Sequence, residues 1–316
     1  MSDPTIPPDP SALSRFGRLE LVARLVVEGV MAGLHRSPFK GASVEFAEHR
    51  QYGPGDEMRH IDWRAYGKTD RYFVKEFEES TSLTAFLVVD TSSSMGYSGK
   101  AAPWSKLEHA RRLAASVAQL MIGQRDAVGL ATSRSVDDPR ALIPARSTSG
   151  HFSILCETLD ADGPTGEVPV SRILHDVAAR ARRRGLIVVF SDGFEPLDDL
   201  ILALRHLRHR HHEVLFFHIL DPDEETFPFS RPAVFRGLEN RGRHIQPLGD
   251  PATVRARYQA RFKAFCQALQ ESLQGMGADY VKASSMEPPE QTLLDYLTSR
   301  ARRSPGRGGR PLSGGG

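Results

Sequence analysis

The sequence passes from an uninterrupted apolar run to a cluster of polar side chains within the stretch Ala85-Phe86-Leu87-Val88-Val89-Asp90-Thr91-Ser92-Ser93-Ser94-Met95. An apolar run rich in Val and Leu predicts a central strand of a parallel sheet, buried on both faces. Open α/β sheets bind ligands beyond the carboxyl ends of such strands. Asp90, Ser92 and Ser94 therefore stand where a site is expected, and their oxygens are ligands that Mg²⁺ and Mn²⁺ prefer.

The rest of the chain alternates between short apolar runs and segments of helical periodicity. We expect strands at residues 84–90, 127–131, 141–145, 186–190, 213–220 and 279–282. We expect helices at residues 105–122, 150–160, 168–183, 197–209, 251–274 and 288–301. This alternation predicts an α/β fold, a doubly wound and mostly parallel sheet flanked by helices.

Composition changes along the chain predict four parts. Residues 1–12 are Pro-rich and are expected to form a disordered lead-in, and residues 13–80 are expected to hold an N-terminal helix and a small β-rich region. Residues 81–301 form the expected α/β domain, and residues 302–316 a disordered, basic, Gly-rich tail.

Bulk composition narrows the class of protein. The 316 residues carry 41 Lys plus Arg against 39 Asp plus Glu, so no global field directs the chain to nucleic acid or to a membrane surface. No window of about 18 consecutive apolar residues predicts a membrane span, and Cys156 and Cys266 lack the spacing of metal ligands. We expect a cytoplasmic protein.

A second apolar strand, residues 186–190, ends in Ser191-Asp192-Gly193. If the two apolar strands are neighbours, Asp90 and Asp192 face one crevice at the carboxyl edge of the sheet. A further hydroxyl, Thr165, lies in a Gly-Pro-Thr-Gly loop ahead of the helix that leads to the second strand. The sequence therefore predicts a site for Mg²⁺ or Mn²⁺, with the ligand set Asp90, Ser92, Ser94, Thr165 and Asp192.

Two simpler interpretations compete with parts of this set. Ser92–Ser94 can act as an N-cap for the next helix, because Ser side chains accept hydrogen bonds from unpaired backbone N–H groups. Thr148 or Thr132 can take the place of Thr165 as the third hydroxyl residue.

The order Asp-x-Ser-x-Ser, distant Thr, distant Asp resembles the metal-ion-dependent adhesion site (MIDAS) of the von Willebrand factor A superfamily. The resemblance implies that Ser92, Ser94 and Thr165 bind the metal directly or nearly so, while Asp90 and Asp192 hold its waters. Neutral hydroxyl ligands leave the ion short of negative charge, so that an Asp or Glu of a partner can complete its shell. Such a site can bind a protein partner and need not cleave anything.

A longer resemblance covers residues from about 36 to 300. Residues 46–63 (Phe-Ala-Glu-His-Arg-Gln-Tyr-Gly-Pro-Gly-Asp-Glu-Met-Arg-His-Ile-Asp-Trp), 74–77 and 220–224 resemble the bacterial domain-of-unknown-function family fifty-eight. The resemblance implies a MoxR-type AAA+ ATPase as partner and a chaperone-like or adaptor role. Residues 46–63 either form ion pairs within a hairpin or offer a docking surface, for which Arg, Tyr and Trp are common anchors. The candidate docking residues are Arg50, Tyr52, Asp56, Arg59, Asp62 and Trp63.

The alternative function is phosphotransfer of the haloacid-dehalogenase type, with Asp90 as nucleophile. That class also places an Asp after the first buried strand and a later Asp after another. Its phosphatases require an acid two residues after the nucleophile, where this chain has Ser92, and a suitably placed Lys, for which no candidate emerges from the sequence. We therefore expect a non-catalytic, metal-dependent binding module.

Overall fold

The computed structural model describes residues 18–36, 50–51, 73–74, 83–134, 138, 141–161, 163–164, 168–181, 183–230, 234–236, 245–247 and 251–303. The chain divides into two compact units, residues 35–82 and the remainder.

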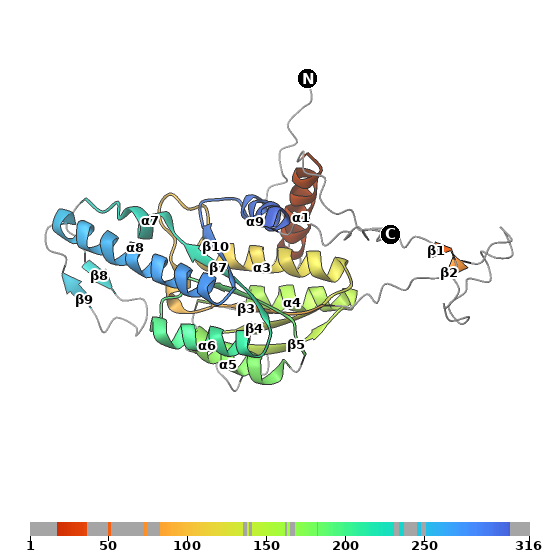
Figure 1. Cartoon of the computed structure of the whole chain (residues 1–316). Coiled ribbons are helices and arrows are strands. Elements are labelled where there is room, and N and C mark those ends of the chain that lie inside the picture. The colour runs from red at the N-terminus through yellow and green to blue at the C-terminus, as the bar shows by residue number, and fades with distance from the viewer. Residues whose placement is uncertain are drawn as a thin grey trace, which may run out of the picture. The chain divides into compact units, whose positions relative to one another are not determined.

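The main unit is built on a six-stranded sheet (Figure 1). Its strands are β3 (Thr84–Val89), β4 (Ala127–Thr132), β5 (Leu142–Arg146), β6 (Leu186–Ser191), β7 (Glu213–Leu220) and β10 (Asp279–Ser284). Their order is β10-β7-β6-β3-β4-β5, and every pairing is parallel except that of β4 with β5. The chain thus starts in the middle of the sheet, builds toward β5, and returns to β6 to build toward β10. This is the doubly wound sheet that the sequence predicted.

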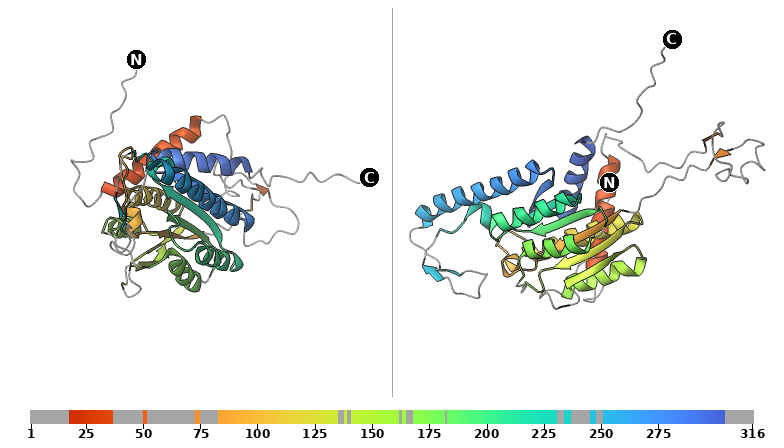
Figure 2. Two further views of the ribbon diagram at one scale, coloured as in Figure 1. Left: turned by 90° about the vertical axis from the view of Figure 1, so that its left-hand side faces the viewer. Right: turned by 60° about the horizontal axis from the view of Figure 1, so that its bottom comes forward.

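Helices cover both faces of this sheet (Figures 1 and 2). One face carries α1 (Arg18–Arg36), α3 (Lys106–Gly123), α4 (Ser149–Ala161) and α9 (Pro289–Arg303). The other face carries α5 (Val170–Arg180), α6 (Leu197–His209) and α8 (Pro251–Gly275). Short elements complete the unit: the 3-10 turn η3 (Ser93–Gly96), α7 (Pro222–Thr226), β8 (Val234–Arg236) and β9 (Ile245–Pro247).

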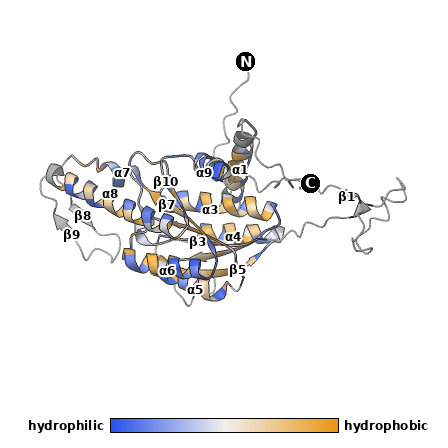
Figure 3. Cartoon of the chain, viewed as in Figure 1, coloured by the Kyte–Doolittle hydropathy of each residue, from blue (hydrophilic) through white to orange (hydrophobic). Residues whose placement is uncertain are grey.

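Alternating side chains of the central strand supply both cores. Leu87 and Val89 point into the core under α3, whereas Phe86 and Val88 point into the core under α5 and α6. All four are buried, which explains why the strand is apolar at every position rather than at every second one. Hydrophobic residues follow the sheet, while the surrounding helices carry both hydrophobic and hydrophilic residues (Figure 3).

Helix α1 belongs to the core of the main unit. Leu19, Ala23, Val26 and Val30 recur at helical spacing, are buried, and join the core under α3. The sequence grouped this helix with the β-rich region in residues 13–80, but the structure places it with the α/β unit.

The remaining predicted elements agree closely with the observed ones. Each strand and helix expected between residues 84 and 301 is present, with ends shifted by a few residues. The sequence did not predict η3, α7, β8 or β9, which are all short, or the antiparallel direction of β5. Along the described part of the chain, no helix is both long enough and apolar enough to cross a bilayer.

The smaller unit contributes one antiparallel pair of short strands, β1 (Arg50–Gln51) and β2 (Phe73–Val74). Arg50 pairs with Val74 and Gln51 with Phe73. These strands lie within the predicted β-rich region, and its other residues fall outside those that the structure describes.

A close backbone approach at Gly185 predicts a stability effect. A Cβ added there would lie 2.2 Å from the carbonyl oxygen of Thr84, where β6 starts beside β3. We expect Gly185→Ala to lower the free energy of unfolding by about 2–4 kcal/mol. Gly123→Ala is the control, because nothing lies within 4 Å of its added Cβ, and it should be neutral or stabilising by up to about 1 kcal/mol. Equal urea midpoints for the two variants would contradict the argument.

Candidate functional site

The site residues are gathered by the pairing of β3 with β6. These strands are neighbours at the point where the chain reverses its direction across the sheet, with Val89 beside Phe190. Asp90 follows the first strand and Asp192 the second, so both lie at the carboxyl edge, and both are buried (4% and 5% exposed). This is the topological position at which doubly wound sheets bind their ligands.

Asp90 is held rigidly by hydrogen bonds. Its Oδ1 accepts from the backbone N–H of Ser92 at 2.9 Å and from the hydroxyl of Ser133 at 3.3 Å. Its Oδ2 accepts from the hydroxyl of Ser191 at 2.6 Å. The carboxylate therefore orients the start of the turn that carries the serines. Ser133 and Ser191 were not predicted as members of the site, although both directly follow or end strands of the sheet.

Ser92 and Ser94 lie on the same side of the turn η3. Their Oγ atoms are 3.1 Å apart, and the hydroxyl of Ser94 also hydrogen-bonds to Asp192. The N-cap interpretation is wrong: Ser92 makes no capping hydrogen bond. Helix α3 is capped instead by Ser105, whose hydroxyl accepts from the backbone N–H of Glu108 at 3.2 Å.

A buried lysine stands beside the two carboxylates. The Nζ of Lys106, whose side chain is 1% exposed, lies 2.8 Å from Asp192 Oδ2 and 2.5 Å from Glu224 Oε1. No suitably placed Lys could be identified from the sequence, whereas the structure places Lys106 at the site. Lys106 is the first residue of α3. Its burial could not be expected from the sequence, because lysine is almost never fully buried unless it is paired.

The charges of the site are distributed unequally. Burial, together with the nearby charge of Asp192, raises the pKa of Asp90 to about 6. Burial alone would raise the pKa of Asp192 as well, but the ammonium of Lys106 lowers it below its ordinary value. The carboxylate of Asp192 is thus fixed as an anion, while Asp90 is poised for a cation or a proton to relieve its charge.

The loop before α5 reaches the same turn. A Cβ added at Gly96 would lie 2.8 Å from the Cβ of Pro164, so this proline packs directly against η3. Pro164 precedes Thr165 in the chain, and Thr165 itself lies outside the described residues.

The two rival threonines separate clearly. Thr148 follows β5, which is antiparallel, and so lies near the opposite edge of the sheet. Thr132 ends β4 beside Val89 and is 1% exposed, and its Oγ1 has no hydrogen-bond partner among the described residues.

A second cluster of carboxylates ties the loops of this edge together. Asp221, fully buried, accepts from the backbone N–H of Gly99 at 2.9 Å and from the hydroxyl of Ser285 at 3.2 Å. Tyr97 donates from its hydroxyl to Asp223 at 2.9 Å. The side chains of Asp221 and Glu224 form a capping box that starts α7. The motif at residues 220–224 thus anchors the loop that follows η3.

Most of the candidate docking residues predicted from the sequence lie outside the described part of the chain. Arg50 lies in β1. Tyr52, Asp56, Arg59, Asp62 and Trp63 fall outside the residues that the structure describes.

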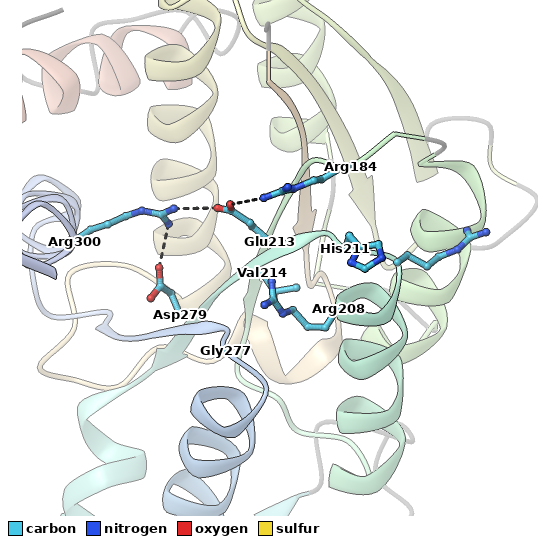
Figure 4. Close-up of a pocket in the computed structure, with 9 residues that line it drawn as sticks. Arg184, Arg208, His211, Glu213, Val214, Gly277, Asp279 and Arg300 are labelled. Atoms are coloured by element: carbon cyan, nitrogen blue, oxygen red, sulfur yellow. Dashed lines mark hydrogen bonds and ion pairs between the residues drawn. The ribbon is translucent and has the colours of Figure 1, made fainter. Parts of the chain in front are cut away.

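A pocket of about 720 Å³ lies at the edge of the sheet opposite to the candidate site (Figure 4). Its arginines are engaged in the fold: Arg300 bridges Glu213 and Asp279 at 3.0 and 3.1 Å, and Arg184 approaches Glu213 at 3.7 Å. Arg208 donates to backbone carbonyl groups. These contacts join the starts of β7 and β10 to α6 and α9, which is a structural role.

A family model described as "Protein of unknown function DUF58" matches residues 48–266. The uncharacterized protein Rv1480 of Mycobacterium tuberculosis (strain ATCC 25618 / H37Rv) is 29% identical over 235 residues, which cover 73% of this chain and 72% of the relative. The uncharacterized protein YeaD of Bacillus subtilis (strain 168) is 26% identical over 157 residues, or 50% of this chain and 36% of YeaD.

Two solved structures to which the chain is similar are BatB and an Rpn10 domain. The conserved hypothetical protein BatB from Bacteroides thetaiotaomicron aligns with a TM-score of 0.46 and 14% identity, over 70% of this chain and 99% of BatB. The SpRpn10 VWA domain aligns with a TM-score of 0.40 and 11% identity, over 68% of this chain and 95% of that domain.

The raised pKa of Asp90 predicts a pH-dependent stability. Its pKa of about 6 in the folded state exceeds the value of 3.8 in the unfolded state. Between these pH values the folded state therefore binds more protons than the unfolded state does. The contribution of Asp90 to stability is therefore greatest below pH 3.8 and is lost as the pH rises through about 6. We expect Asp90→Asn to stabilise the metal-free protein by about 1–3 kcal/mol at pH 7.5, and the gain to vanish near pH 4. Urea titrations in chelator at both pH values test this, and a gain independent of pH would contradict it.

The burial of Lys106 predicts that Mg²⁺ can replace its positive charge when the lysine is removed. Lys106→Met leaves Asp192 and Glu224 unpaired, which should cost about 3–5 kcal/mol in chelator. Millimolar Mg²⁺ should then raise the melting temperature of Lys106→Met more than that of the wild type, because it replaces the missing charge. Lys100→Met, at an exposed position, is the control and should behave as the wild type. The explanation is wrong if Mg²⁺ stabilises Lys106→Met no more than the wild type.

Proposed function

The chain belongs to the DUF58 family, and from the chemistry of its site we propose that it is a non-catalytic, metal-dependent protein-binding module. The site takes Mg²⁺ or Mn²⁺ at Asp90, Ser92, Ser94, Thr165 and Asp192, and engages an acidic side chain of a partner. The observation that carries the proposal is the pair of hydroxyls of Ser92 and Ser94, 3.1 Å apart, between two buried carboxylates.

The donor set fits a hard divalent cation. Hydroxyl and carboxylate oxygens are the ligands that Mg²⁺ and Mn²⁺ prefer, and two hydroxyls 3.1 Å apart are close enough to serve one ion. Asp90 lacks a cationic partner among the described residues and has a raised pKa, as expected of a carboxylate near which a cation is to be bound. The described residues hold no cluster of three His, Cys, Asp or Glu side chains suited to a metal, so an ion here depends on hydroxyl oxygens.

Such a donor set favours binding over catalysis. Neutral hydroxyls from Ser92 and Ser94 withdraw little of the positive charge of the ion, which when bound supplies an electrophilic centre with an open coordination position. The two aspartates hold the hydroxyls in place, since Asp90 fixes the backbone of Ser92 and Asp192 accepts from Ser94. A carboxylate from a partner then completes the charge balance.

The phosphotransfer alternative has to use the same Asp90 as a nucleophile. Its Oδ1 and Oδ2 both accept hydrogen bonds, and the residue is 4% exposed. Lys106, which could offset the charge of a phosphate, is buried and already bonded to two carboxylates. The position of a general acid is taken by Ser92. These contacts favour the binding module.

The partner is proposed from the resemblance of the sequence to the bacterial family fifty-eight, which implies a MoxR-type AAA+ ATPase as partner. We propose such an ATPase as the protein whose acidic side chain reaches the site, with a role in the assembly or maturation of protein complexes. The motif at residues 220–224, which also carries the resemblance, lies close to the site, because its acids anchor the loop that follows η3.

Calorimetric titration with Mg²⁺ and Mn²⁺ tests the site. The wild type, stripped of metal, should bind weakly and saturably, and Ser92→Ala should weaken binding by about tenfold or more, because it removes a direct ligand. Ser93→Ala is the matched control, one residue along the same turn and outside the pattern. Capture of a MoxR-type ATPase should require metal and should be lost in Asp90→Ala. Binding that is equal in Ser92→Ala and Ser93→Ala, or capture that survives both chelator and Asp90→Ala, would refute the proposal.

A further inference from the structure

Helix α8 differs from the other long helices of the unit in how it is buried. Leu269 and Leu273, in its C-terminal half, are fully buried and pack in the core with α6. None of the described residues from Val254 to Phe265 is buried. At 1.5 Å per residue the helix is about 37 Å long, and its N-terminal half extends past the sheet on the side of α7 (Figures 1 and 2). It therefore forms a wall beside the carboxyl edge.

A groove of about 1010 Å³ lies between this wall and the candidate metal site. Asp192, a proposed member of the metal site, lines one side, together with Phe194. The wall contributes aromatic side chains and two arginines, Arg257 and Arg261, which are one helical turn apart. The groove and the metal site are thus continuous through Asp192.

The aromatic surface of the wall is ordered by ring contacts. Tyr258 stacks on Phe262 with centroids 5.8 Å apart and contacts Phe227 at 4.9 Å. Phe265 meets the edge of the His218 ring at 6.0 Å, and His218 Nε2 lies 2.9 Å from the carbonyl oxygen of Asp192. A rigid aromatic surface loses little conformational entropy on binding.

The arginines of the wall are available to a partner. Arg257 and Arg261 are exposed, and neither forms a hydrogen bond or ion pair with another described residue. Arg255 on the same helix, in contrast, donates to the carbonyl oxygen of Phe229 at 3.0 Å. Phe194, beside Asp192, is 73% exposed. Arginine and aromatic side chains are the residue types that dominate binding energy at interfaces.

We propose that this groove binds an acidic segment of a partner protein, in which several Asp or Glu residues flank an aromatic or aliphatic anchor. The proposal rests on the proposed function, since the same segment would present a carboxylate to the metal site. Arg257 and Arg261 would pair with its acids, and the aromatic wall would receive its anchor. A nucleic acid also suits arginines and aromatic rings, but each of its units carries a phosphate, whereas an acidic segment can place its acids at Arg257 and Arg261 and uncharged residues near Glu195 and Glu224.

Selection of short random peptides displayed on phage against the full chain in Mg²⁺ tests the proposal. Selected peptides should be enriched in Asp and Glu next to aromatic or aliphatic residues. Synthetic copies should bind Arg257→Glu/Arg261→Glu at least tenfold more weakly than the wild type. Lys263→Glu is the matched control, since Lys263 is exposed on the same helix and does not line the groove, and it should bind as the wild type. All three changed residues are exposed, so circular dichroism should show unaltered folding.

A second arm in chelator separates this proposal from the metal site. Peptide binding that persists in chelator but is lost in Arg257→Glu/Arg261→Glu supports the groove and counts against metal-dependent capture. Binding that requires Mg²⁺ but is equal in Arg257→Glu/Arg261→Glu and Lys263→Glu overturns the groove and leaves the metal site standing. Failure to select any acidic peptide, or selective binding of a single-stranded oligonucleotide in its place, also overturns the groove.

Discussion

Two carboxylates buried at the ends of adjacent strands impose the constraint on which the rest of the site depends. Asp90 and Asp192 are brought together by the parallel pairing of β3 with β6, and two buried like charges repel strongly. Three features reduce this repulsion. The buried ammonium of Lys106 pairs with Asp192, and the hydroxyls of Ser133 and Ser191 donate to Asp90. The raised pKa of Asp90 favours its protonation. The balance is incomplete at Asp90, and this residual charge is the physical reason to expect a cation at this edge.

The loops around this pair form one connected frame. Lys106 joins the loop after β6 to α7 through Asp192 and Glu224, and Asp221 joins α7 to the loop after η3 through Gly99. Pro164 packs on Gly96 from the third side. These contacts connect Asp192 to α7 and, through His218, to the aromatic wall of α8.

The sequence predicted what local patterns encode. Unbroken apolar runs mark strands buried on both faces, so β3, β6 and β7 and the acids that follow them could be located. The burial of Lys106 could not, because it arises from two carboxylates 86 and 118 residues away in the chain. Nor could the contact of Ser133 with Asp90, 43 residues apart. The direction of β5 and the extension of α8 past the sheet could not be predicted either. Both depend on tertiary packing, and neither changes the periodicity of the segment itself.

The proposed metal site and the proposed binding groove would complement each other energetically. A single carboxylate on a metal ion whose other ligands are hydroxyls gives a strong local attraction but little discrimination, because every acidic partner offers the same group. A groove of about 1010 Å³, with stacked rings and two guanidinium groups that no described residue pairs, would add shape and charge pattern, and these would distinguish one acidic segment from another. Since the groove adjoins Asp192, a segment held there presents its carboxylate at high effective concentration. Weak intrinsic metal affinity is then compatible with selective capture, because the ion and the segment each stabilise the bound state of the other.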